Sequence, residues 1–186
     1  MPLFDRRRKR LEKVDRVVAG LSILRDRLDR RIREMNRRQR QLFEQVVAAK
    51  SEGDDERALI YASELKQLRA MMNLTIRNEL IIEAVMNRLS AVRDLEDLRN
   101  YVAPIRSLVS SIAPDVRGIL PEVSVHVHRV QSDLEDLSLE MGSVPNVVLR
   151  PIEPDEEEVR RILEEASEIA KRRLRDSTPE PPSRAL

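Results

Sequence analysis

The side chains best suited to a binding role lie at the very start of the sequence. A short apolar tip, Leu3 and Phe4, is followed by five consecutive bases: Arg6, Arg7, Arg8, Lys9 and Arg10. An apolar wedge beside a basic run binds anionic head groups, because the two weak attractions add. Each base near an anionic surface contributes about 1 kcal/mol, and the effect multiplies when many copies line up. We predict that this tip binds a membrane; nucleic-acid phosphate and a solvated, frayed terminus are the alternatives.

No catalytic motif is recognisable in the sequence. It lacks a Gly-rich phosphate loop, a Gly-x-Ser-x-Gly motif, and any Cys that could act as a nucleophile or a zinc ligand. The two histidines, His126 and His128, are two residues apart and would face different directions on a helix. Two imidazoles without a third ligand are a weak indication of a metal site. We therefore expect a protein that is not an enzyme and that uses no metal or other cofactor.

Charge divides the sequence into a basic front and an acidic back. Residues 1–50 contain 16 Lys and Arg against 7 Asp and Glu, whereas the rest of the chain contains 18 against 26. The acidic excess is concentrated over residues 122–168, with 13 acids against 4 bases. Such a division indicates a polyanionic partner for the basic half, mutual masking of the two halves, or both in turn. The acidic back is free to lie on the basic front.

The composition favours long helices over a wide globular core. Aromatic residues make up 2% and charged residues 36%, with no Trp and 4 Gly, so few side chains can fill a broad interior. No stretch approaches the roughly 18 consecutive apolar residues of a membrane span, and the basic start lacks the apolar segment of a secretory signal. We expect an all-α protein in the cytoplasm.

Apolar periodicity predicts two long helices that form an antiparallel hairpin. Gly53 and the acids after it predict a tight helix-to-helix turn over 50–56. The second helix is expected over 55–102, a stretch without Gly or Pro. The first is expected over 5–50, where apolar residues recur at steps of three and four. The pattern continues throughout if Arg25 and Gln39 are counted as polar seam positions. The apolar seam residues are Leu11, Val14, Val18, Leu21, Leu28, Ile32, Met35, Leu42 and Val46.

The middle of the second predicted helix is apolar on more than one side. A helix that lines only a two-helix hairpin needs a single stripe, so the extra face requires a partner in the same chain or in a neighbouring copy. We predict a polymer interface there, with ordinary core filling as the alternative. Its residues are Met71, Met72, Ile76, Leu80, Ile82, Met86 and Leu89.

Prolines divide the remainder into shorter elements. Pro104, Pro114 and Pro121 predict hinge-like bends that bound a short helix over 105–112. An apolar seam from Val123 to Met141 favours a helix, although a strand over 123–128 is the competing interpretation. The predicted organisation is a tip (1–10), a helical core (11–141, with the hairpin at 11–102 and shorter helices at 105–141), a linker (142–154), a helix (155–175) and a disordered Pro-rich tail (176–186).

The predicted last helix begins with four acids and ends with bases, in keeping with the helix dipole. Its apolar stripe consists of Val159, Ile162, Leu163, Ala166 and Ile169.

This order of elements and charges resembles the ESCRT-III family, and within it the archaeal cell-division members. The resemblance covers about residues 3–175 and includes local sequence at 88–96, 120–123 and 133–135. It implies a protein, peripheral on the inner face of the cell membrane, that changes from a closed monomer to homo- or hetero-filaments and constricts membrane in division or scission.

The resemblance also implies that the helix over 155–175 is autoinhibitory and that it recruits an AAA ATPase of the Vps-four type. The family's tail motif is matched in spacing at Glu156, Val159, Leu163 and Ala166. It is not matched at Ile162, where the motif has Arg, or at Ser167, where the motif has a base.

Two other functions are compatible with the same residues. A coiled-coil nucleic-acid organiser would use the arginines on phosphates and would not need Leu3 or Phe4. A soluble helical scaffold or adaptor would bind a partner's helix and show no affinity for lipid. A membrane-bound filament subunit is the leading hypothesis, and nucleic acid is not the partner that we expect.

Overall fold

The computed structural model describes residues 2–92 and 95–142, with side chains from residue 7 and, after the gap, from residue 96. These residues fall within one compact unit, Met1–Val147. They are helical, with no strand in the described ranges: α1 (Pro2–Ser51), α2 (Asp55–Ser90), α3 (Leu95–Ile119), the short 3-10 helix η1 (Pro121–Val123) and α4 (Ser124–Met141). The all-α prediction is confirmed. The linker beyond Gly142, the last helix and the tail lie outside the described residues.

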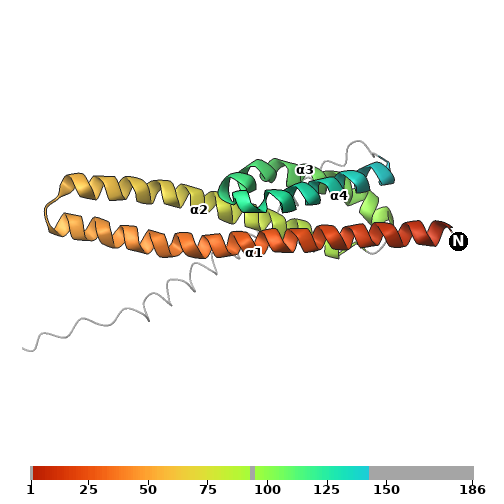
Figure 1. Ribbon diagram of the computed structural model, residues 1–186, viewed down its shortest axis with the longest axis horizontal. Helices are drawn as coiled ribbons and strands as arrows, with labels where there is room; N and C mark the ends of the chain where they lie inside the picture. Colours follow the sequence, from red (N-terminus) through yellow and green to blue (C-terminus); the bar gives the residue numbers. More distant parts are fainter. Residues whose placement is uncertain (1, 93–94, 143–186) are drawn as a thin grey trace, which may run out of the picture. The chain divides into compact units, whose positions relative to one another are not determined.

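The predicted antiparallel hairpin is present, with α1 and α2 side by side along their length (Figure 1). The turn between them has Gly53 at φ 73°, a conformation that side chains with a Cβ disfavour. Asp54 caps α2, since its carboxylate accepts a 3.0 Å hydrogen bond from the Arg57 backbone N–H. The acids Asp55 and Glu56 then lie in the first turn of α2, where their negative charges interact favourably with the positive end of the helix dipole.

The buried stripe of α1 differs in part from the predicted seam. Val17 and Leu24 are fully buried, whereas Val18 and Arg25, predicted at the equivalent heptad positions, are partly exposed. The reason is that α1 faces α4 as well as α2, so the stripe that it buries is displaced and wider than a two-helix seam. The prediction is correct at the shared positions Val14, Leu21, Leu28, Met35 and Leu42.

The predicted end of the second helix, at residue 102, is wrong. Helix α2 stops at Ser90, and α3 then runs from Leu95 to Ile119 with Pro104 and Pro114 inside it, so the predicted short helix over 105–112 is also wrong. A proline in a helix interior costs roughly 3 kcal/mol. Burying one large apolar side chain contributes roughly 1.5–3 kcal/mol, and α3 buries a stripe that is continuous across both prolines: Leu98, Val102, Ile105, Val109, Ile112 and Val116.

Helix α4 confirms the helical interpretation of residues 123–141. Its buried residues Val127, Val130, Leu134 and Leu137 follow the predicted seam, and it stops at Gly142 with φ 71°. Helix α4 also comes very close to α1 at Gly20. A Cβ added to Gly20 would lie only 2.5 Å from Cγ2 of Val130.

Helices α3 and α4 cover only the half of the hairpin nearer the start of the chain (Figure 1). The core cluster accordingly takes residues of α1 up to Leu28 and residues of α2 from Ile82 onward. The remainder of the hairpin, residues 35–80, extends beyond this layer as a two-helix segment that we call the distal arm. Its α1 and α2 seam is narrow, with Ala49 and Ala58 among the buried residues.

Candidate functional site

A row of ion pairs joins α1 to α4. Lys13 Nζ lies 4.0 Å from Asp136 Oδ2 and also binds the Glu140 carboxylate, while Arg16 Nη2 lies 3.8 Å from Asp133 Oδ1. Arg10 Nε lies 3.7 Å from Glu140 Oε2. We call these six residues, Arg10, Lys13, Arg16, Asp133, Asp136 and Glu140, the α1–α4 ion-pair network.

This network neutralises charge more than it stabilises the fold. Its side chains are partly exposed, from 17% for Asp133 to 57% for Asp136, so each pair contributes roughly 0.2–1 kcal/mol and is screened by salt. Helix α4 is held in place by its apolar residues in the core cluster, Val127, Val130, Leu134 and Leu137. The prediction that the acidic back lies on the basic front is confirmed for α4; the acids beyond residue 142 are outside the described residues.

The predicted membrane-binding tip forms the first turns of α1. Leu3, Phe4 and Arg6 lie in the helix, in a part whose side chains the structure does not describe. Arg7, Arg8 and Lys9 are exposed, and Arg8 Nε lies 3.4 Å from Glu12 Oε1. Arg10 differs from them, because its side chain is only 24% exposed and lies against α4. The tip and the ion-pair network are therefore consecutive stretches of one helix. Among the described helices, none combines the length and apolarity that crossing a membrane requires.

The predicted polymer interface on α2 is divided between the surface and the core. Met71 and Leu80 are exposed, at 46% and 58%, and Met72, Ile76 and Met86 are partly buried. Ile82 and Leu89 are at most 2% exposed and belong to the core cluster. These two side chains are not accessible in this conformation, because α1 and α3 pack against that end of α2, and the interface itself stays a prediction.

The distal arm exposes further large apolar side chains that sequence reasoning did not single out. Phe43 and Val47 of α1 are 51% and 45% exposed, and Leu59 and Ile60 of α2 are 68% and 52% exposed. They fall outside the seam that α1 and α2 share, which is the signal that would have identified them.

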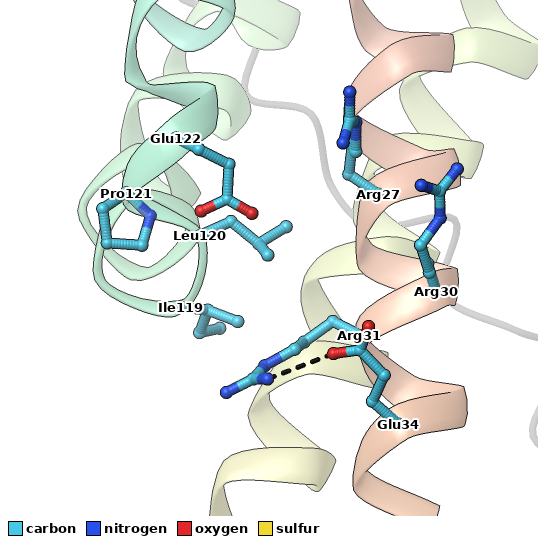
Figure 2. A pocket seen from close by; sticks show the side chains of 8 residues that line it. All are labelled: Arg27, Arg30, Arg31, Glu34, Ile119, Leu120, Pro121 and Glu122. Carbon is cyan, nitrogen blue, oxygen red and sulfur yellow. Dashed lines mark hydrogen bonds and ion pairs between the residues drawn. The ribbon is translucent and has the colours of Figure 1, made fainter.

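A pocket of about 410 Å³ lies where the α3–η1 corner meets α1. Figure 2 shows Arg27, Arg30 and Arg31 on α1 across from side chains of the corner. Arg31 Nη1 is paired with Glu34 Oε2 at 3.2 Å. The remaining lining residues are Ile119, Leu120, Pro121 and Glu122. We call this site the arginine pocket; it was not predicted, because its two sides are about 90 residues apart in the sequence.

The predicted autoinhibitory and ATPase-recruiting residues are outside the described part of the chain. They are Val159, Ile162, Leu163, Ala166 and Ile169.

Relatives of this chain are found in Sulfolobus acidocaldarius. The Cell division protein B of that organism is 31% identical over 184 residues, which are 97% of this chain and 70% of the relative. Its Cell division protein B1 is 30% identical over 162 residues, which are 86% of this chain and 74% of the relative. No protein-family model and no solved structure matches the chain.

Proposed function

The chain belongs to the Cell division protein B family, and from that premise we propose that it is a non-enzymatic subunit of membrane-bound filaments that constrict or cut membrane in archaeal cell division. It acts on the inner face of the cell membrane, in the manner of ESCRT-III proteins. The observation that carries the proposal is the position of the α1–α4 ion-pair network directly beside the basic tip.

In this proposal an anionic surface competes with α4 for the bases of α1. In the closed form, Asp133, Asp136 and Glu140 neutralise Arg10, Lys13 and Arg16. A ligand shifts a conformational equilibrium only through its differential affinity for the two states. Anionic lipid has that differential affinity, because it binds the uncovered bases better than the covered ones. Membrane binding therefore favours release of α4 from α1.

The hairpin provides the surfaces for self-assembly. Because α1 is one helix from Pro2 to Ser51, a tip bound to lipid fixes the direction of the whole hairpin. The exposed Met71 and Leu80 and the apolar residues of the distal arm are then available to neighbouring copies, and Ile82 and Leu89 join them only if α3 and α4 move. From the family resemblance, the helix over 155–175 keeps the monomer closed and binds an AAA ATPase of the Vps-four type.

The test of the tip is the double substitution Leu3→Asp with Phe4→Asp. We expect it to abolish sedimentation with anionic vesicles, because it replaces the apolar wedge with charges that anionic lipid repels. Helicity measured by circular dichroism should be retained, since the core cluster begins at Val14. Undiminished sedimentation, or tight binding to duplex DNA that weakens steeply with salt, would contradict the proposed role of the tip.

A further inference from the structure

Two arginines on the wall of the arginine pocket carry charges that the described residues leave unpaired. Arg27 and Arg30 form neither an ion pair nor a hydrogen bond with another described residue. The Glu122 carboxylate points toward α1 in Figure 2, but the pocket is lined by three arginines, Arg27, Arg30 and Arg31, against the two acids Glu34 and Glu122, so its lining keeps a net positive charge. The corner contributes apolar side chains. The pocket therefore suits an anionic group that is attached to an apolar one.

The hairpin turn, residues 52–56, has the complementary character. It contains four acids around Gly53. Asp55 is paired with Lys50, and Glu52 and Asp54 are paired with Arg57, so four acids against two bases leave residues 50–57 with a net charge of −2. Lys50 Nζ donates a 2.5 Å hydrogen bond to Asp55, and this bond together with the charge of Lys50 lowers the pKa of that carboxyl from its ordinary value of 3.8, so it stays ionised at neutral pH. Beside the turn, Leu59 and Ile60 are 68% and 52% exposed. The turn thus combines anionic and apolar groups.

The turn of a chain cannot enter the arginine pocket of the same chain. Both lie on one continuous helix, α1, which extends to Ser51. The 20 residues from Arg31 to Ser51 span about 30 Å at 1.5 Å per residue. A contact between the two surfaces therefore has to join different copies.

We propose that the acidic turn of one copy docks in the arginine pocket of a second copy. Arg27 and Arg30 meet the acids of 52–56, and Leu59 and Ile60 cover the apolar side of the pocket. This inference rests on the proposed function and specifies a contact within the filament, in which the ion-paired end of α4, residues 133–140, leaves residues 10–16 of α1 while the α3–η1 corner stays beside residues 27–34. The contact joins two different surfaces and leaves a free turn at one end and a free pocket at the other, so it propagates as an open filament unless its rotation closes a ring. Two parallel copies joined in this way are staggered by about 30 Å along the hairpin.

Charge reversal tests the contact. We expect the pocket variant, Arg27→Glu with Arg30→Glu, and the turn variant, Glu52→Arg with Glu56→Arg, each to raise the protein concentration needed for assembly on anionic vesicles by roughly tenfold or more, because like charges then face each other. An equimolar mixture should assemble again, since each reversed surface attracts its counterpart. Sedimentation and negative-stain microscopy measure both results, and thermal unfolding verifies that the variants fold.

The matched control is Arg99→Glu with Arg106→Glu, which makes the same change in charge at exposed positions of α3 outside the pocket, the ion-pair network and the distal arm. This variant should assemble like the wild type. If the pocket and turn variants also assemble like the wild type, or if the control is impaired as much as they are, the docking contact is wrong.

A cross-link separates this inference from the proposed function. The chain has no Cys, so Arg30→Cys and Glu56→Cys each introduce a single thiol. Mixed and oxidised on vesicles, the two variants should form a disulfide-linked heterodimer, whereas Arg37→Cys mixed with Glu56→Cys should not. Equal cross-linking of both pairs would overturn the docking contact alone. A wild-type chain that forms no assembly on vesicles would contradict the proposed function, and the contact with it.

Discussion

At the scale of single residues, Glu140 makes the most contacts in the α1–α4 ion-pair network. Its carboxylate binds Lys13 and lies 3.7 Å from Arg10 Nε, and its backbone carbonyl accepts a 3.2 Å hydrogen bond from Arg10 Nη2. The Glu140 side chain is 40% exposed, so water and salt compete with each of its side-chain contacts. Glu140 therefore controls how accessible Arg10 and Lys13 are to an anionic partner. Removing its charge should lower the stability of the fold only slightly.

Glu140→Gln removes this charge and keeps the side-chain shape. We expect the free energy of unfolding to fall by about 0.2–1 kcal/mol. At low salt the bound fraction on anionic vesicles should increase severalfold, because Arg10 and Lys13 become available to lipid. Thermal unfolding and vesicle sedimentation measure the two effects. Glu135→Gln, the same change at an exposed position of α4 outside the network, should produce neither effect, and equal vesicle binding by the two variants would contradict the masking role.

At the scale of elements, the packing of α4 on α1 depends on a glycine. Gly20 lies in the middle of α1, where an alanine would be expected to stabilise the helix by about 1 kcal/mol. A Cβ there would meet Val130 at 2.5 Å, a separation that requires one of the two helices to shift. The absence of a side chain at Gly20 therefore sets how closely α4 approaches the basic part of α1.

Gly20→Ala should be destabilising despite its higher helix propensity. Overpacking costs roughly 1–3 kcal/mol, and displacement of α4 should also increase binding to anionic vesicles. The control is Gly118→Ala in α3, where an added Cβ meets nothing within 4 Å, so this variant should be more stable by about 0.5–1 kcal/mol. Adding Val130→Ala to Gly20→Ala should relieve the clash, which a double-mutant cycle of thermal unfolding detects. If Gly20→Ala and Gly118→Ala are equally stabilising, α4 does not pack on α1 as described.

Helices with one buried stripe could be predicted from the sequence. The hairpin, its turn at Gly53 and the end of α4 at Gly142 all follow from periodicity and from residues with special backbone preferences. The break after Ser90 could not be predicted, because residues 91–94 contain neither Gly nor Pro. The continuity of α3 was missed for the opposite reason. Its prolines are local signals for a bend. The cost of proline inside the helix is outweighed by burial of the apolar side chains that α3 carries on both sides of each proline.

The candidate site could be predicted only in outline. Counting charges identified a basic front and an acidic back, but not that Lys13 meets Asp136 and Glu140, because their pairing depends on how α3 and α4 fold back over the hairpin. The arginine pocket and the burial of Ile82 and Leu89 depend on the same folding back. Such contacts connect residues that are far apart in the sequence, and periodicity within one helix carries no information about them.

At the scale of the whole molecule, the described part of the chain combines a continuous basic helix with a short acidic helix that covers part of it. Helix α1 carries the tip, the ion-pair network, the arginine pocket and one side of the distal arm. A tip held on a membrane therefore fixes the direction of every other surface that this helix carries. In our proposal an anionic membrane displaces α4 from α1 and so converts the closed chain into an assembling one.

Displacement of α4 can be measured as the distance between spin labels on α1 and α4, attached through Ala19→Cys and Ser132→Cys, two exposed positions in a chain without native Cys. Pulsed electron paramagnetic resonance should give one short distance in solution and with neutral vesicles, and a longer, broader distribution with anionic vesicles. The same short distance in protein that has sedimented with anionic vesicles would show that membrane binding leaves α4 on α1, contrary to this proposal.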